Sequence, residues 1–503
     1  MGAYFAGLLL AAHALSAAGQ PAPAPGDPFV AAALELFAAW DATALTESAA
    51  AAADKEKGHL ASGLTAFLSG DYATALRLGN AAARSELPDL QAAGEGLADL
   101  SASWQTVFSG LKPFPAPAAG VSAGQAAAVQ VFYPASLPAP DAALLAHARL
   151  VAAECTGWLA AEGDKALPVV VFLAAVSDLA TVSRIPVARL EATGTVATTV
   201  WGRILLLSPA SFPDGYPWDR VLCHEAVHFT LHTRVRSGLP LFLEEGLAAY
   251  LEDVGPTGAP HVAGPADAAL ASLAAGQSLL LSQTDLDSPY YNLDSPVAAR
   301  IAFLQVRFLV SQLVKQGGDA ALRNLVDAVA QGIQWRAAVA GVAGFSEAGV
   351  TSWLKGRPRD EAPRSDVLLM TAAVAPDRLP EKSARSLEPA RRDVLLADLL
   401  WGRGKLSAAL GILSRLPDEL RLTPDTTWRI AMLLLTLQRP AEADAALAAP
   451  LALFPDDARL LYCAARARLA LGDRGQAGQL ARRAWLVNPF AKETIELLGR
   501  THD

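Results

Sequence analysis

The stretch Val-Leu-Cys-His-Glu-Ala-Val-His-Phe-Thr at residues 221–230 contains the motif HExxH and is the most informative part of this chain. Its apolar residues are too numerous for a surface helix, so we expect a buried helix here. Positions i and i+4 lie on one helical face, which lets the imidazoles of His224 and His228 reach one metal ion. Glu225 would project beside them. These three side chains would be costly to bury without such a partner.

A second apolar segment supplies the third candidate ligand. Residues 241–250 read Leu-Phe-Leu-Glu-Glu-Gly-Leu-Ala-Ala-Tyr, and Glu245 lies seventeen positions after the motif's second histidine. A glutamate on this second helix would complete a site of two histidines and one glutamate with an open fourth position, as in a catalytic zinc site. Glu244 is the alternative, since a slip of one position rotates a side chain by about 100°. We favour Glu245 because the adjacent Gly246 allows another helix to approach closely.

The sequence excludes a three-histidine site of the metzincin type. Such a site needs a histidine at position 234 and a glycine at position 231, where this chain has Arg234 and Leu231. His232 continues the i, i+4, i+8 series from His224, but at a rise of about 1.5 Å per residue it lies roughly 12 Å further along the axis. We therefore expect His232 to line the cleft or to be a polar residue at the helix end.

The block from Phe242 to Tyr250, after an HExxH, resembles the peptidase MA-like gluzincins, with phenylalanine where relatives have tryptophan. The similarity covers roughly residues 120–357 and includes Gly194–Ala197, Ile204–Pro209, Gly215–Trp218, Phe308–Leu309 and the glycines near 317. The resemblance implies an α+β, zincin-like domain with a small mixed sheet plus helices. It also implies that Zn²⁺ is bound by His224, His228 and Glu245, with Glu225 as the general base.

The implied activity is hydrolysis of an amide bond. Bound zinc lowers the pKa of its water toward neutrality and polarises the scissile carbonyl, while Glu225 accepts the water proton and delivers it to the leaving amine. A strand beside the zinc helix would let an extended peptide pair with it, and residues 195–200 and 204–207 are the candidates. The second run is entirely apolar, so it is equally consistent with an interior strand.

The chain departs from its relatives at one position of interest. Relatives often have a tyrosine in the helix near residues 301–305, where this chain reads Ile-Ala-Phe-Leu-Gln and has no hydroxyl. If that tyrosine steadies the oxyanion in relatives, another group must do so here. Tyr290 and Tyr291 are the candidates, although a pair of loop tyrosines can also be a packing lid. The glycine-rich motif of membrane alanyl aminopeptidases is absent, which favours an endopeptidase.

Composition limits the remaining classes. With 503 residues, 52% apolar and 18% charged, the chain is globular and too long for one core, so we expect two to four domains. The net charge is -9 and there is no cluster of basic residues, so we do not expect the chain to bind nucleic acid. An apolar run at residues 4–18 predicts a signal peptide over residues 1–19, and hence a periplasmic or secreted protein. An alanine-rich helix start is the alternative. The run is too short to span a bilayer, and we expect no stable membrane span.

The three cysteines give little information. Cys155, Cys223 and Cys463 are odd in number, far apart and without metal-type spacing, so we expect buried free thiols. Cys223 immediately precedes the HExxH motif, but a position one residue back is about 100° away from the ligand face. We therefore do not expect it to bind the metal.

The carboxy-terminal part repeats with a period of 34 residues. Three sets of residues keep this interval, namely Ala397, Ala431 and Ala465, then Ala409, Ala443 and Ala477, then Pro455 and Pro489. This period with small residues at the helix crossing is typical of tetratricopeptide repeats, and it predicts units at residues 395–416, 428–450 and 460–489. Residues 63–82 resemble one more unit. For any single unit, a generic alanine-rich helical hairpin is the alternative.

Proline-containing stretches without periodicity at residues 111–119 and 356–364 indicate linkers. We therefore expect a mostly helical chain with a helical amino-terminal region and one hairpin at 27–110, a zincin-like domain at 120–356, and tetratricopeptide-like repeats at 365–503. The leading hypothesis is an exported zinc metallopeptidase whose repeats select a protein substrate or bind a protein partner. The alternatives are a catalytically idle zinc-binding repeat scaffold and a zinc hydrolase of other amides, such as those of the cell wall.

Overall fold

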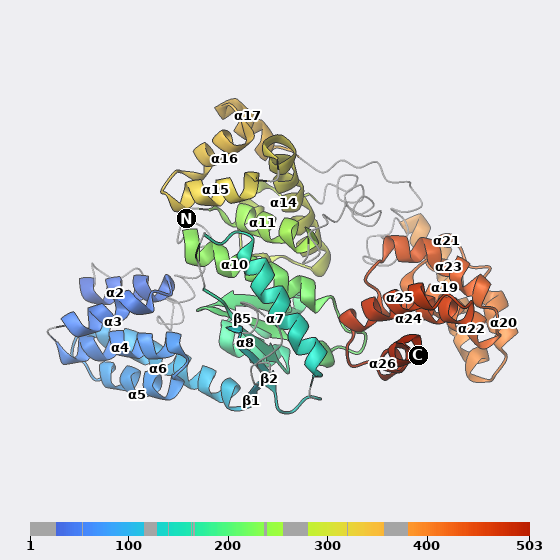
Figure 1. Cartoon of the computed structure of the whole chain (residues 1–503), viewed down its shortest axis with the longest axis horizontal. Helices are drawn as coiled ribbons and strands as arrows, with labels where there is room; N and C mark the ends of the chain where they lie inside the picture. The colour runs from blue at the N-terminus through green and yellow to red at the C-terminus, as the bar shows by residue number, and fades with distance from the viewer. Residues whose placement is uncertain are drawn as a thin grey trace.

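The computed structural model describes residues 27–52, 54–114, 128–138, 140–161, 163, 166–235, 239–254, 280–318, 320–356 and 381–502. The expected signal peptide and the expected linker beyond Gly356 lie outside these ranges. Figure 1 shows amino-terminal helices in blue, a central part that contains a sheet, and a carboxy-terminal helical array in orange and red. The predicted class is confirmed, since the described chain is mostly helical with one small mixed sheet.

The sheet has five strands in the order β1-β2-β3-β5-β4. Their bounds are β1 Leu111–Pro113, β2 Val131–Pro134, β3 Val169–Leu173, β4 Ala197–Val200 and β5 Arg203–Leu207. Strands β2, β3 and β5 run parallel, while β1 and β4 pair antiparallel at the two edges. The expectation of a linker is wrong for residues 111–113, which pair with β2. Three residues are too few to show a strand period in the sequence.

Strand β5 is entirely buried because both faces of the sheet are covered. Leu205 and Leu207 pack among the amino-terminal helices, whereas Ile204 and Leu206 pack beneath α7 (Ala142–Gly157) and α10 (Trp218–Val235). The all-apolar run at 204–207 is therefore an interior strand, and β4 is the edge strand beside it. Trp201 and Gly202 connect the two strands with φ of 47° and 74°, a two-residue turn that suits the twist of a hairpin.

Several helices precede the sheet. They are α2 (Pro28–Ala38), α3 (Ala42–Ala51), α4 (Lys55–Ser69), α5 (Tyr72–Ala82) and α6 (Pro88–Ser109). The ring of Trp201, from the β4–β5 turn, lies within 5.7 Å of the rings of Phe37, Phe67 and Trp104, measured between centroids. This aromatic cluster fixes the amino-terminal helices to the sheet face opposite α10.

The helices after the sheet build the core around α10. They are α11 (Leu241–Val254), α13 (Gln283–Leu286), η3 (Tyr290–Asn292), α14 (Pro296–Gly317), α15 (Ala321–Ala330), α16 (Trp335–Ala343) and α17 (Glu347–Leu354). Three shorter helices lie before α10, namely α8 (Val176–Ser183), α9 (Val187–Thr193) and η2 (Pro209–Ser211). Helix α14 is long and apolar enough to cross a membrane by length and composition. Its residues Ala302, Val306 and Val310 are, however, buried in the core cluster that α14 shares with α11, as in the core helix of a globular domain.

The carboxy-terminal helices pair in sequence. They are α19 (Glu381–Gly402), α20 (Leu406–Leu413), α21 (Asp418–Arg421), α22 (Pro424–Thr436), α23 (Pro440–Leu453), α24 (Ala458–Ala470), α25 (Arg474–Val487) and α26 (Lys492–His502). All six alanines that keep the 34-residue interval are at most 1% exposed, and Pro455 and Pro489 lie in the turns after α23 and α25. These small residues lie where paired helices touch, which is the arrangement that the period predicts.

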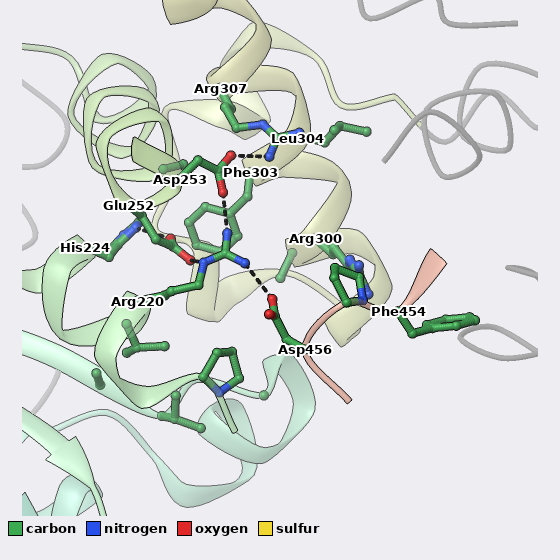
Figure 2. Close-up of a pocket in the computed structure, with 18 of the residues that line it drawn as sticks. Arg220, His224, Glu252, Asp253, Arg300, Phe303, Leu304, Arg307, Phe454 and Asp456 are labelled. Carbon is green, nitrogen blue, oxygen red and sulfur yellow. Dashed lines mark hydrogen bonds and ion pairs between the residues drawn. The ribbon is translucent and has the colours of Figure 1, made fainter. Parts of the chain in front are cut away.

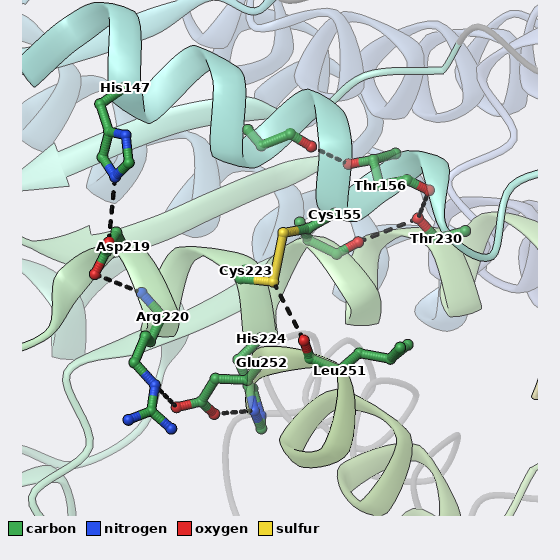
Figure 3. Close-up of a disulfide and its surroundings, with 12 residues drawn as sticks. His147, Cys155, Thr156, Asp219, Arg220, Cys223, His224, Thr230, Leu251 and Glu252 are labelled. Carbon is green, nitrogen blue, oxygen red and sulfur yellow. Dashed lines mark hydrogen bonds and ion pairs between the residues drawn. A yellow bond between two sulfur atoms is a disulfide. The ribbon is translucent and has the colours of Figure 1, made fainter. Parts of the chain in front are cut away.

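A disulfide joins Cys155 of α7 to Cys223 of α10, with the two Cα atoms 5.4 Å apart (Figure 3). The expectation of free thiols is therefore wrong for these two residues, while Cys463 is a buried free thiol. The pair is 68 positions apart in the sequence, and no sequence pattern shows where α7 crosses α10. The helix that carries HExxH is thus cross-linked next to its first histidine.

Candidate metal centre

Helices α10 and α11 bring three side chains to one point. His224 and His228 lie one turn apart on α10, and their Nε2 atoms are 3.1 Å from each other. The Oε2 atom of Glu245, on α11, lies 3.3 Å from the first Nε2 and 3.4 Å from the second. One donor atom from each residue fits within a span of 4.8 Å. The structure therefore places together the three ligands that the sequence suggested.

The spacing of these donors fits a zinc ion. Bonds of about 2.0–2.1 Å from a tetrahedral zinc to nitrogen and oxygen place the ligand atoms about 3.3–3.4 Å from one another. The observed separations of 3.1, 3.3 and 3.4 Å are close to that value. Two imidazoles and one carboxylate are also a donor set of catalytic zinc sites, which leave one position open. The residues present therefore fit this metal.

Glu245 lies next to the point where α11 packs most closely on α14. If any other residue replaced Gly246, its Cβ would lie 2.8 Å from the carbonyl oxygen of Val306. Only glycine therefore fits at this crossing. The neighbouring Glu244 is not part of the three-residue cluster. Burial raises the pKa of Glu244 to about 7, whereas the pKa of Glu245 is lowered. The two adjacent glutamates therefore have different environments.

Charges in the cluster shift the pKa values of its members. Burial would raise the pKa of Glu245, but the two histidines hold it well below its usual range. Burial would lower the pKa of His224, but hydrogen bonds with Glu245 and Glu252 raise it well above the usual value. The pKa of His228 is also raised, since Glu245 outweighs burial. The carboxylate of Glu245 thus favours positive charge at both histidines, and a metal ion bound there would displace their protons.

Glu225 is buried beside the two histidines and is held by the edge strand of the sheet. The hydroxyl of Thr199, in β4, donates to its Oε2 over 2.6 Å. The same hydroxyl also lies 3.0 Å from the backbone carbonyl oxygen of Glu225. Burial raises the pKa of this carboxyl above its usual range, against the opposing charges of His228 and His224. A raised pKa suits a carboxylate that must accept and return a proton near neutral pH.

A second layer of charged residues orients His224. Oε2 of Glu252 lies 3.2 Å from Nδ1 of His224, which leaves Nε2 facing Glu245. Such a carboxylate partner fixes the tautomer and the ring orientation of a metal-binding histidine. Oε1 of Glu252 lies 3.6 Å from Nε of Arg220 (Figure 2). Arg220 also pairs with Asp253, which in turn pairs with Arg307 of α14.

Two residues of the centre, His224 and Glu225, line a cavity of about 1010 Å³. One wall comes from residues 193–197, which lead into β4, and another comes from α14, including Phe303. A further wall comes from the carboxy-terminal array and consists of residues 451–457 and Arg483. The cavity is therefore a composite of segments that are more than two hundred residues apart in the sequence.

This geometry agrees with the comparison to known families. Residues 183–356 match the Peptidase MA superfamily. This Peptidase MA domain contains α10, α11 and α14, and hence the three clustered residues and Glu225. No curated protein matches the chain. Among solved structures, the crystal structure of the P58(IPK) TPR domain is 15% identical and covers 56% of this chain and 92% of its own, with a TM-score of 0.23.

In the Peptidase MA domain, Phe303 packs against the candidate ligand His224, at the position where the sequence resemblance led us to look for a hydroxyl. Its ring centroid lies 5.5 Å from that of His224 and 5.1 Å from that of Tyr290. Tyr290 lines the cavity and is 8% exposed, and its hydroxyl has no hydrogen-bond partner among the described residues. Burial, together with the charge of Glu245, raises its pKa well above the usual value. The side chain of Tyr291 lies outside the described part of the structure.

His232 lies away from the cavity, contrary to the expectation that it lines the cleft. Its Nε2 lies 3.0 Å from the carbonyl oxygen of Ala38, and its ring stacks on Trp40 with centroids 3.6 Å apart. Two turns of α10 separate it from His224, so it reaches the amino-terminal helices instead. The other expectation, a polar residue near the helix end, describes it better.

Sequence reasoning missed several residues of this centre. Glu252 could have been found, because it follows Glu245 by seven positions and two helical turns bring it to the same face. Arg220 could have been found in the same way, because it lies four positions before His224 and therefore on the same helical face. Thr199 and Asp456 gave no signal, since only the tertiary structure brings them to the Peptidase MA helices.

Proposed function

We propose that this chain is a zinc-dependent metallopeptidase that cleaves within protein substrates. The observation that supports it most is the convergence of His224, His228 and Glu245 beside the buried Glu225. The match of this region to the Peptidase MA superfamily adds to it. The open cavity and the edge strand next to it provide room for a peptide.

Each residue has a distinct role in the proposed reaction. Zn²⁺ held by His224, His228 and Glu245 would supply Lewis acidity and lower the pKa of a water molecule. Glu225 would take the proton of the attacking water and pass it to the leaving amine, as its raised pKa allows. Thr199 restricts the rotation of this carboxylate by holding one of its oxygens. An extended substrate would pair with the edge of β4 that contacts no other strand among the described residues.

Tyr290 is our candidate for steadying the oxyanion. Its hydroxyl is buried at the cavity and has no partner among the described residues, a state that a developing negative charge would relieve. Replacing Tyr290→Phe should lower kcat by about 10²-fold while zinc content stays unchanged. An unchanged kcat would remove Tyr290 from this role.

We also propose that the protein is exported. The Cys155–Cys223 disulfide supports this, because structural disulfides persist mainly in oxidising compartments. The apolar residues 4–18 agree with it. Amino-terminal sequencing of the mature protein should then begin close to Gly19, and an intact amino terminus in the cytoplasm would contradict export.

The function is tested by peptide cleavage and zinc content in one set of purified full-length proteins. Glu225→Gln should lower the rate of cleavage of a proteome-derived peptide library by about 10²- to 10⁴-fold and retain the metal. Glu154→Gln, on the exposed face of α7, is the matched control and should behave like the wild type. Zinc in stoichiometric amount without cleavage by the wild type would favour the idle scaffold instead, and absence of zinc would contradict the proposal.

A further inference from the structure

The carboxy-terminal array is docked on the segment that leads into α10. The backbone N–H of Tyr216 donates to the carbonyl oxygen of Val487 over 3.0 Å, and Nδ2 of Asn488 donates to the carbonyl oxygen of Pro213 over 2.9 Å. Gly215 has a φ of 68°, and a Cβ there would lie only 2.2 Å from that same Val487 oxygen. The start of α10 and the end of α25 therefore fit directly against each other.

The buried face of this contact is apolar. Trp485, on α25, is only 5% exposed and belongs to the same core cluster as Trp218 and Leu222 of α10. The array is thus packed into the core under the metal-binding helix. Any group that it presents near the cavity is held in a fixed place.

One such group is Asp456, in the turn between α23 and α24. Its carboxylate lies 2.8 Å from Arg220, which is one helical turn before His224 (Figure 2). Nε of Arg220 lies 3.6 Å from Oε1 of Glu252, and Oε2 of Glu252 lies 3.2 Å from Nδ1 of His224. A continuous row of charged groups therefore connects the repeat array to a candidate metal ligand.

The contact that depends on Asp456 is the one between Arg220 and Glu252. The guanidinium of Arg220 has three acidic partners, and its contact with Glu252 is the longest of them. A planar guanidinium keeps its orientation when carboxylates hold several of its edges. Without Asp456, Arg220 is free to turn toward Asp253 and away from Glu252. Glu252 would then lose the partner that aims its other oxygen at His224.

We propose that Asp456 is a positioning residue for the metal centre, acting through Arg220 and Glu252, so that the repeat array is a structural part of the active site. The inference rests on the proposed function, since it requires a metal at the three clustered ligands. The alternative is that Asp456 and Arg220 form only a docking ion pair, which would leave metal affinity untouched. Both side chains are about a third exposed, and such pairs contribute little to stability alone.

A double-mutant cycle on zinc affinity separates these two roles. The zinc dissociation constant is measured by competition with a chelator on the full chain. Glu252→Gln should weaken binding by about 10- to 100-fold, and Asp456→Asn by a smaller factor of about 3 to 10. The double variant should bind about as Glu252→Gln alone does, because both changes act on the same imidazole.

Asp444→Asn is the matched control. Asp444 pairs with Arg468 over 2.7 Å wholly inside the array, at a similar partial exposure, so its loss should leave zinc affinity at the wild-type value. Zinc affinity of Asp456→Asn equal to that of the wild type would overturn the inference, and so would losses that multiply in the double variant. A wild-type protein that binds no zinc would instead overturn the proposed function.

Discussion

The Peptidase MA domain and the repeat array are both largely helical, but they bury different kinds of side chains. The first buries His224 and Glu225 together with Arg203 of β5, and Arg149 is buried just before it on α7. Among residues 387–501, whose side chains the structure describes, no charged side chain is buried, and alanine and leucine fill the core. Ionisable groups are expensive to bury without partners, so their concentration marks where chemistry is expected. The core of the array has no such groups among its described residues, so we expect packing and surface contacts from it and no chemistry.

The largest expected effect concerns the disulfide of α10, the helix that carries HExxH. The Cys155–Cys223 disulfide closes a loop of 68 residues, so its loss in a Cys155→Ala/Cys223→Ala variant should lower the free energy of unfolding by about 4 kcal/mol. Calorimetry of the full chain should show this as a lower melting temperature for the double variant than for the wild type. Thiol titration of the denatured wild type without reductant should find only Cys463 reactive. Three reactive thiols would show that Cys155 and Cys223 are not joined by a disulfide.

A medium effect is expected inside the array. Ala443 is fully buried where paired helices touch, so Ala443→Leu should lower the free energy of unfolding by about 1–3 kcal/mol through overpacking. Ala441→Leu, two positions away on the exposed side of α23, should change it little. Zinc content should stay unchanged in both. If the two variants were equally stable, the buried alanine positions would not be what holds the array.

The smallest expected effect concerns the boundary between the two regions. Gly215 and Gly202 both have a positive φ, but only Gly215 lies against the array, since nothing lies within 4 Å of a Cβ at Gly202. In urea unfolding, Gly215→Ala should be less stable than Gly202→Ala by at least about 1 kcal/mol. Equal stabilities would mean that the array is not docked at this point.

The sequence predicted what depends on periodicity and close spacing. HExxH with Glu245 predicted the cluster of two histidines and one glutamate, and the 34-residue interval predicted the helix pairs of the array. What it could not predict depends on which helices cross. Cys155 and Cys223 were expected to be free because their pairing needs the crossing of α7 and α10. Thr199 reaches Glu225 only because β4 lies at the sheet edge beside α10.

The central claim, a metal bound by His224, His228 and Glu245, is tested most directly by the zinc content of three purified proteins. The wild type and Glu244→Ala should each contain about one equivalent of zinc, because Glu244 lies outside the ligand cluster. Glu245→Ala should lose most of its metal, since a site of three protein ligands would be reduced to two. Retention of zinc by Glu245→Ala together with its loss from Glu244→Ala would contradict the account.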